Sequence, residues 1–198
     1  MITKTIGHDL ASEPTSSEGA VGVPEAKWFV AIVNSRHEKK VAESLQESGI
    51  TSYVATQKEM KVWKNGKRKT IDRVVIPSVV FVHCTEKERR QIVSLPFIYR
   101  FMVNRSAESG TLNKPVAVIP DLQIRKLQFM LGQSDLPVNF VPSAFKVKDN
   151  VRVIRGSLKG LYGQIMENSD GSHTLTVGIE LLGGAAVKID PYDVEKID

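Results

Sequence analysis

Cysteine and long apolar runs are scarce in this sequence. Cys84 is the only cysteine among 198 residues, which excludes an internal disulfide and a cysteine-based zinc cluster and is typical of a reducing compartment. No stretch approaches the roughly 18 consecutive apolar residues that a membrane-spanning helix needs. The first residues lack the apolar centre and the arginine-rich amphipathic pattern of targeting signals. The sequence therefore predicts a cytoplasmic protein that does not associate with membranes.

Patterns of catalytic and metal-ligating residues are also missing. The four histidines are scattered, and His83 and Cys84 are neighbours in a predicted strand, so their side chains should point to opposite faces. Asp170, Ser172 and His173 cluster in a predicted turn but lack the strand–turn–helix context that exposes a nucleophilic serine. Turn formation is the simpler interpretation of this cluster. We expect no catalytic residues, no metal and no cofactor, and so no enzyme.

Residues 154–165, IRGSLKGLYGQI, combine glycines with cations and so invite comparison with a phosphate-binding loop. Such a loop requires G-x-x-x-x-G-K-[ST] at the start of a helix, whereas Gly160 is followed by Leu161 and a β-compatible run. We therefore predict a strand–loop–strand in which glycine permits positive φ or close backbone approach. Its cations are left for RNA or a protein partner. The loop residues are Arg155, Gly156, Lys159, Gly160 and Gly163.

Composition is that of an ordinary globular protein, with 41% hydrophobic and 25% charged residues. The formal charge of +5 and the pI of about 9.3 favour an anionic partner without establishing one. Residues 1–26 are rich in Ser, Glu, Gly and Thr, and they offer too little apolar surface to offset their ordering entropy. We expect them to form a flexible leader.

Residues 27–134 alternate between strand and helix patterns. Strands are expected at 27–34, 50–56, 78–84 and 97–104, and helices at 35–48, 85–96 and 119–132. Ser35 with Glu38, and Thr85 with Glu88, have the spacing of a capping box. A hairpin is expected between the second and third strands. This order predicts an α+β, ferredoxin-like βαββαβ domain with an antiparallel sheet.

The character of the chain changes after residue 134. Residues 135–144 contain two prolines and no periodicity, and we expect them to form a linker. Residues 145–198 contain short β-compatible runs separated by turn signals, which is typical of a small all-β barrel. The chain should therefore consist of two domains of different class.

The predicted hairpin is strongly basic. Residues 58–73 carry seven cations and two carboxylates, a net charge of +5 that equals the formal charge of the whole chain. Asn65-Gly66 is a preferred pair for a tight hairpin turn, and Trp63 lies beside it. Cations and an aromatic residue suit backbone contact and base stacking on single-stranded nucleic acid. Alternatively, the lysines only protect an edge strand from aggregation. The candidate nucleic-acid-binding residues are Arg36, His37, Lys61, Trp63, Lys64, Lys67, Arg68, Lys69 and Arg73.

The motifs taken in order resemble a known family. KWFVAIVNSRHEKKVAESL, the lysine-rich hairpin and VIPSVVFVH together resemble the NGN domain of the NusG family of transcription elongation factors. DNVRVIRGSLKGLYGQIMEN resembles the KOW motif that opens their C-terminal SH3-like barrel. The resemblance covers roughly residues 27–198. The leader, IPSVVFVH and VIPDLQIRKLQFML further resemble UpxY-type regulators of capsular polysaccharide operons.

The resemblance implies a mechanism of antitermination. NGN domains place an apolar surface on the clamp helices of the largest RNA polymerase subunit and suppress pausing, and some also grip non-template DNA or contact nascent RNA. The KOW barrel of relatives recruits a second protein, NusE or Rho. Val79 stands where the family usually has an aromatic residue, and some of these positions must be core because a strand alternates faces. The implied polymerase-binding residues are Trp28, Phe29, Ile76, Pro77, Val79, Phe81, Phe97 and Phe101.

One rival function remains open, a KOW-type RNA-binding or ribosome-associated module that never contacts polymerase. The two functions differ in the surface they need. An exposed, contiguous apolar patch around Trp28, Ile76, Val79 and Phe81 would support polymerase binding. Complete burial of these side chains would remove the contact surface.

Overall fold

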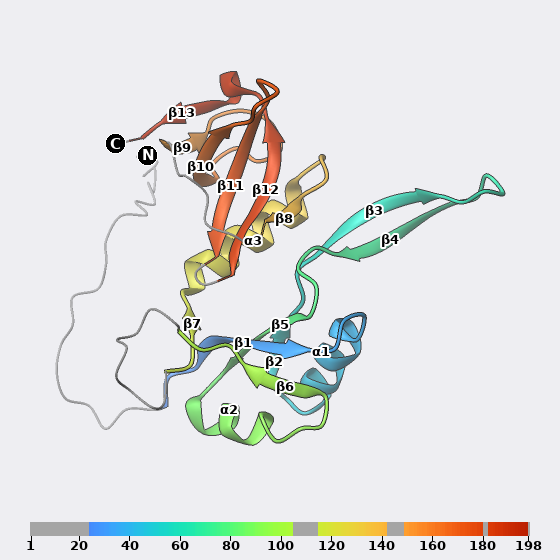
Figure 1. Cartoon of the computed structure of the whole chain (residues 1–198), viewed down its shortest axis with the longest axis vertical. Helices are drawn as coiled ribbons and strands as arrows, with labels where there is room; N and C mark the ends of the chain where they lie inside the picture. Colours follow the sequence, from blue (N-terminus) through green and yellow to red (C-terminus); the bar gives the residue numbers. More distant parts are fainter. Residues whose placement is uncertain (1–23, 105–114, 142–148, 180–181, 198) are drawn as a thin grey trace, which may run out of the picture.

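The computed structural model describes residues 24–104, 115–141, 149–179 and 182–197. Most of the predicted leader therefore lies outside the described residues. The described chain forms an N-terminal sheet with helices, a two-stranded arm that projects from it, and a C-terminal sheet (Figure 1). The fold is mixed α/β with antiparallel sheets.

The N-terminal sheet has the strand order β2-β5-β1-β6, with β7 also paired to β1, and every pairing is antiparallel. Two helices follow β1 and β5 and pack on one face of this sheet. The predicted order of strands and helices is observed, with the short strand β7 in addition. The elements are β1 (Lys27–Val33), α1 (Glu38–Glu47), β2 (Thr51–Tyr53), β5 (Val79–Cys84), α2 (Glu86–Ile92), β6 (Ile98–Phe101) and β7 (Val118–Ile119).

The two predicted capping boxes have different outcomes. The one at α2 is confirmed, because the Thr85 hydroxyl accepts the Glu88 amide at 3.3 Å and the Glu88 carboxylate accepts the Thr85 amide at 2.7 Å. The one at α1 is wrong. The Glu38 side chain is buried and accepts the backbone N–H of Ser78 at 2.7 Å, so it does not reach back to Ser35. The α1 helix begins without a side-chain cap.

Helix α3 (Asp121–Gln133) packs on the other face of the N-terminal sheet, at the predicted place in the sequence. Ile124, Leu127 and Met130 recur at helical spacing and are buried in one hydrophobic core with side chains of both sheets. The C-terminal sheet lies against α3 through β11. The helix therefore separates the two sheets.

The C-terminal sheet is antiparallel and has the strand order β13-β9-β10-β11-β12-β8. Its interior is built by alternate residues such as Leu175, Val177 and Ile179 of β11. The expectation that residues 135–144 form only a linker is wrong in part, because β8 pairs with β12 and extends the sheet. The elements are β8 (Asn139–Val141), β9 (Asp149–Val153), β10 (Tyr162–Glu167), β11 (His173–Ile179), β12 (Gly183–Ile189), the short 3-10 helix η1 (Pro191–Asp193) and β13 (Val194–Lys196).

Candidate nucleic-acid and protein interfaces

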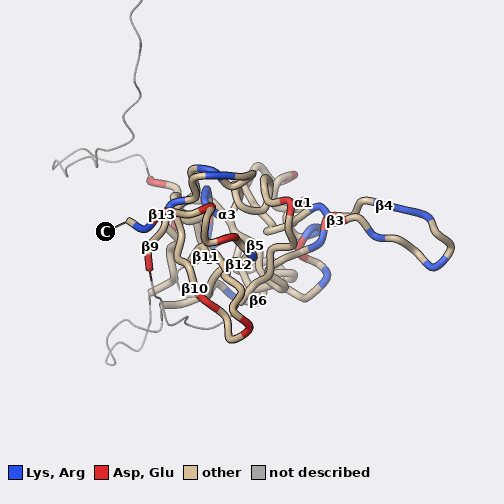
Figure 2. The backbone as a smooth tube through the Cα atoms, turned by 90° about the horizontal axis from the view of Figure 1, so that it is seen from above, with Lys and Arg blue, Asp and Glu red and all other residues tan. Residues whose placement is uncertain are grey.

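The basic hairpin forms the projecting arm. It consists of β3 (Thr56–Val62) and β4 (Arg68–Val74), which pair only with each other. Figure 2 shows Lys and Arg along both strands and at the tip. Every residue from Lys61 to Thr70 is exposed, including Trp63 at 56%. The predicted cations of the tip therefore lie free in solvent on an element that protrudes from the rest of the molecule.

The loop at the tip is three residues long, from Lys64 to Gly66. The Trp63 amide donates to the Lys67 carbonyl at 2.9 Å, and the Gly66 amide donates to the Trp63 carbonyl at 2.8 Å. Gly66 has a φ of +76°, which glycine adopts at little cost. This is a type of hairpin loop that ends with glycine in the left-handed conformation, one residue longer than the tightest Asn-Gly turn. The extra residue fixes which side chains lie opposite each other.

Arg73 was predicted to bind nucleic acid, but it lies at the root of the arm and is engaged within the protein. Its guanidinium pairs with the Glu59 carboxylate at 2.8 Å and donates to the Val138 carbonyl at 2.7 Å. The neighbouring Gln57 side chain is only 6% exposed, and its oxygen accepts the Val138 amide at 2.8 Å. Its amide nitrogen donates to the Leu136 carbonyl at 2.8 Å. These contacts fasten the arm to the segment that follows α3.

The basic start of α1 lies beside the same root. The Lys39 ammonium donates to the backbone carbonyl of Asp72 on β4 at 2.7 Å. Arg36 and His37 are exposed next to it, and Arg36 adopts a φ of +69°. The structure thus brings Lys39, at the start of α1, into contact with the arm, although the two are far apart in sequence. Cations at a helix start oppose the helix dipole, so they do not serve the stability of α1.

The implied polymerase-binding residues do not form one surface. Pro77 is exposed, but the others divide between two cores on opposite faces of the N-terminal sheet. The core under α1 and α2 contains Phe29 and Phe101, with Phe97 packed against it. The burial of Phe29 and Phe101 leaves them no surface for a partner in this structure, and β1 directs Phe29 away from Trp28 because a strand alternates faces.

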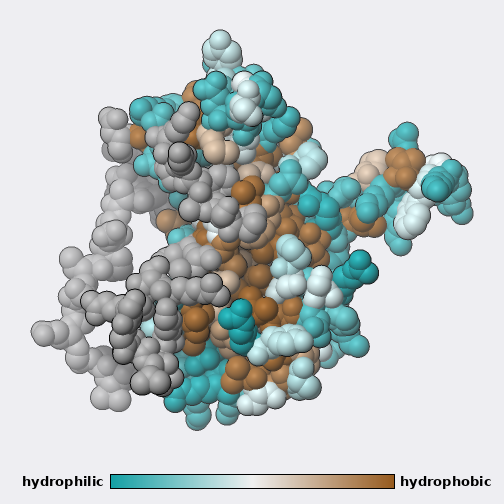
Figure 3. All heavy atoms as spheres, viewed as in Figure 1, coloured by the Kyte–Doolittle hydropathy of each residue, from teal (hydrophilic) through white to brown (hydrophobic). Residues whose placement is uncertain are grey.

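The remaining four residues lie on the face that α3 covers. Their exposed fractions are 9% for Trp28, 1% for Ile76, 5% for Val79 and 0% for Phe81. The Trp28 indole N–H also donates to the Asp121 carboxylate at the start of α3, at 3.1 Å. These four side chains therefore form no exposed apolar patch in the described structure. Figure 3 shows hydrophobic residues in the middle of this view, where α3 lies between the sheets.

The glycine-rich stretch is a strand–loop–strand between β9 and β10, as predicted. Gly156 and Gly160 have positive φ values of +76° and +90°. Gly163 serves close approach instead, because a Cβ there would lie 2.7 Å from the carbonyl oxygen of Thr176. No helix follows that could lend its dipole to a phosphate. The cations Arg155 and Lys159 are exposed.

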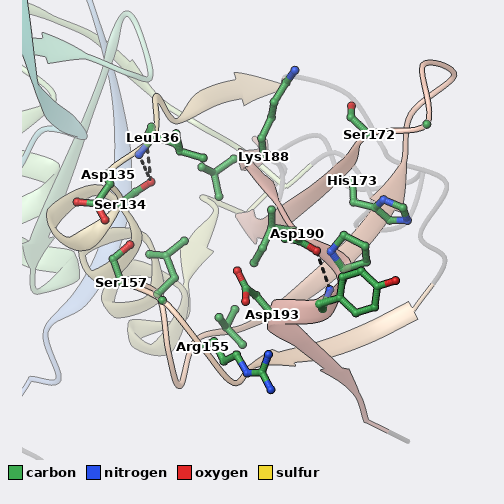
Figure 4. Close-up of a pocket in the computed structure, with 18 residues that line it drawn as sticks. Ser134, Asp135, Leu136, Arg155, Ser157, Ser172, His173, Lys188, Asp190 and Asp193 are labelled. Carbon is green, nitrogen blue, oxygen red and sulfur yellow. Dashed lines mark hydrogen bonds between the residues drawn. The ribbon is translucent and has the colours of Figure 1, made fainter.

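A cavity of about 710 Å³ lies beside this loop, between it, β12, η1 and the end of α3 (Figure 4). Its lining mixes both signs of charge, with the carboxylate of Asp190 turned to the Tyr192 amide at 3.0 Å. Carboxylates on several sides do not favour a phosphate or another anion. The charged lining residues are Asp135, Arg155, Lys188, Asp190 and Asp193.

The chemistry-bearing residues outside these surfaces have structural roles. The Asp170 carboxylate accepts from both the backbone amide and the hydroxyl of Ser172, at 2.9 and 2.6 Å, and these bonds lower the pKa of Asp170. The turn interpretation is confirmed. His83 contacts the Trp28 ring while Cys84 is buried on the other face of the sheet. In the described parts of the chain, no group of three His, Cys, Asp or Glu residues could hold a metal.

The sequence also predicts that no helix spans a membrane. Among the described residues, none of the helices is long and apolar enough to cross a bilayer.

Comparison with known proteins places this combination of sheets and basic arm in a family. The family model described as "Transcription termination factor nusG" matches residues 26–128, slightly more than half of the chain. The chain belongs to the NusG family. It is a NusG-like transcription termination/antitermination factor, and the members of this family are transcription factors and not enzymes.

Two curated relatives carry the name transcription termination/antitermination protein NusG. The protein from Halalkalibacterium halodurans is 26% identical over 185 residues, covering 87% of this chain and 99% of the relative. The protein from Bacillus subtilis is 23% identical over 184 residues, with the same coverage. A solved structure of Thermotoga maritima NusG, described by its domain interaction, aligns with 88% of this chain at 20% identity and a TM-score of 0.45.

Proposed function

We propose that this protein is a transcription elongation and antitermination factor that binds the RNA polymerase clamp helices and suppresses pausing or termination. The family match, which spans the N-terminal sheet and most of α3, carries this proposal. The resemblance of its motifs to UpxY-type regulators favours regulation of particular operons, such as capsular polysaccharide loci. Its place of action would be the cytoplasm, where transcription occurs.

The observed elements support a division into the two predicted domains. The strand order β2-β5-β1-β6, with α1 and α2 on one face, is consistent with a ferredoxin-like NGN domain over residues 27–134. Residues 145–198 would form the SH3-like KOW barrel, which β8 extends from within the segment 135–144. The barrel would hold a second partner, a NusE-like protein or Rho, with Arg155 and Lys159 available at its loop.

Polymerase contact through the predicted face requires α3 to move, because α3 covers Trp28 and Phe81. Ile76→Asp and Phe81→Asp are unsuitable tests, since both sites are buried and a carboxylate there would unfold the protein. Asp121→Ala is better, because it removes the hydrogen bond that holds the start of α3 to the sheet. It should strengthen polymerase binding. Arg125→Ala is the matched control, since it breaks the Arg125–Asp121 ion pair and leaves the Trp28 bond.

The burial of this face favours a second candidate, a nucleic-acid-binding module that never contacts polymerase. A pull-down of the full chain from native lysate, with and without nuclease, separates the two functions. Retention of polymerase subunits after nuclease treatment supports the elongation factor. If polymerase is lost with nuclease and Asp121→Ala restores nothing, the second candidate replaces the first.

A further inference from the structure

We propose that the arm binds single-stranded nucleic acid on one of its two faces only, the face that carries Lys61, Trp63, Lys67 and Lys69. This deepens the proposed function, since it rests on the arm being the nucleic-acid-binding element. In an antiparallel pair, residues directly opposite each other share a face, and the strand period is two. Lys61 lies opposite Lys69, and the Trp63 amide bonds to Lys67, so all four side chains project to the same side.

The charges of this face are uncompensated only near the tip. At the root, Glu59 pairs with Arg73 on the same face, with an N–O distance of 2.8 Å. Two residues further out, Lys61 and Lys69 are direct cross-strand neighbours, and like charges in this position destabilise a hairpin. Lys67 adds a third cation one step beyond. An arrangement that costs the isolated arm stability is explained by an anionic ligand that bridges these ammonium groups.

The indole of Trp63 gives this face its preference for single strands. The side chain is 56% exposed although it is large and apolar, and no ring contact holds it among the described residues. An unpaired base can stack on an exposed indole, whereas bases inside a duplex are stacked on one another. Cations on both sides of the ring would hold the phosphates that flank the stacked base. The chemistry is shared by single-stranded DNA and RNA.

The opposite face of the arm has a different character. Met60 and Val62 are each 64% exposed there, opposite Thr70 and Arg68. Lys58 on this face lies opposite Asp72 and so has a carboxylate to balance it. The cations of this face thus flank apolar side chains and do not form an adjacent pair. Both faces carry exposed cations, so they can be compared at equal net charge.

Two double reversals test the proposal in the full-length protein. Lys61→Glu with Lys69→Glu, and Lys58→Glu with Arg68→Glu, each change the net charge by the same amount and each place two carboxylates opposite each other. Binding is measured by fluorescence anisotropy with an oligo-dT, an oligo-U and a DNA duplex over a series of salt concentrations. The first pair should weaken binding to single strands and lower the salt slope by about 1.4, the value for two lost phosphate contacts. The second pair should leave the slope within about 0.5 of the wild type, and the duplex should bind more weakly than the oligo-dT.

A second comparison isolates stacking. Trp63→Ala should weaken single-strand binding by about 5- to 100-fold, whereas Val62→Ala, an adjacent exposed site on the other face, should leave it unchanged. Circular dichroism checks that every variant is folded. Equal weakening by both double reversals, or tighter duplex binding, overturns the one-face assignment while nucleic-acid binding stands. No binding by the wild type to any probe overturns both this inference and the arm's role in the proposed function.

Discussion

The hydrogen bonds that fasten the root of the arm to the segment after α3 can be tested by substituting Gln57. Its side chain makes four hydrogen bonds, accepting from the Val138 amide and the Arg73 guanidinium and donating to the Leu136 and Ser134 carbonyls. Gln57→Leu keeps the approximate volume of the side chain and removes all four bonds. The question is how much of this loss solvent can replace.

The answer differs among the partners. Leu136 is 51% exposed, so its carbonyl can bond to water in the variant and adds little to the loss. Val138 is 0% exposed, so its amide is left without a partner. An orphaned buried donor costs about 1–3 kcal/mol. We therefore expect Gln57→Leu to lower the free energy of unfolding of the arm root by about 2 kcal/mol, or about 30-fold in the local opening equilibrium.

Hydrogen exchange at Val75 is the assay. Its amide donates to the Ala55 carbonyl at 2.7 Å, at the arm root. Its exchange should accelerate about 30-fold in Gln57→Leu. Gln128→Leu, an exposed site on α3, is the control and should change it less than threefold. Equal exchange of Val75 in the two variants would refute the reasoning.

Gln57→Glu separates the bonds that this side chain accepts from the bonds that it donates. The carboxylate still accepts from Val138 and Arg73 but can no longer donate to the Leu136 carbonyl, whereas a protonated glutamic acid can. The Arg73 guanidinium and the Val138 amide both favour the charged carboxylate, so Gln57→Glu keeps these two donors satisfied at neutral pH. Gln57→Glu should therefore accelerate the exchange of Val75 less than Gln57→Leu does, and equal acceleration by the two variants would contradict the role given to the Val138 amide.

Two further predictions concern buried groups. Thr176→Val should raise the urea midpoint by the equivalent of about 1 kcal/mol, because the Thr176 hydroxyl is buried with no hydrogen-bond partner among the described residues. Thr174→Val should lower it, since that hydroxyl accepts from Asn168 at 2.9 Å, and the opposite ranking would contradict the argument. Burial, and then the Glu88 carboxylate, raise the pKa of the Cys84 thiol from 9.0 to about 11, so Cys84 should favour folding below pH 9 and lose this effect between pH 9 and 11. If the free energies of unfolding of wild type and Cys84→Val change in parallel between pH 9 and 11, this role of Cys84 is disproved.

Local sequence patterns predicted elements well where only neighbours decide, and failed where a distant group competes. Thr85-x-x-Glu88 and Ser35-x-x-Glu38 fit the same capping rule, yet only the first forms the box. The difference is the Ser78 amide, which binds the Glu38 carboxylate from a turn forty residues away. Nothing in residues 35–38 reveals this partner.

The prediction that the segment after α3 is only a linker failed for a related reason. Residues 139–141 have no alternating pattern, so β8 could not be expected from these residues alone. The strand forms because the edge of β12 is available to it, and because Gln57 and Arg73 hold the preceding residue Val138 in place. Both causes lie outside the segment. A strand that depends on the edge of β12 and on hydrogen bonds from Gln57 and Arg73 cannot be predicted from its own residues.

The arm shows how one residue of loop length decides the candidate site. Its charge and its Trp63 could be read from the sequence, but the face that each cation occupies could not. With a two-residue turn at Asn65-Gly66, Lys61 would lie opposite Thr70, and Lys69 would project from the face away from Trp63. The observed three-residue loop shifts the register by one and places Lys61, Lys69 and Trp63 together. Deleting Lys64 would leave Asn65-Gly66 as a two-residue turn between Trp63 and Lys67, so Lys61 should stay opposite Lys69 and the shared face should be kept. Single-strand affinity of the deletion should therefore match that of Lys64→Ala, which loses the same charge and keeps the loop, and a much larger loss in the deletion would mean that the three-residue loop itself, and not the shared face of Lys61 and Lys69, binds the strand.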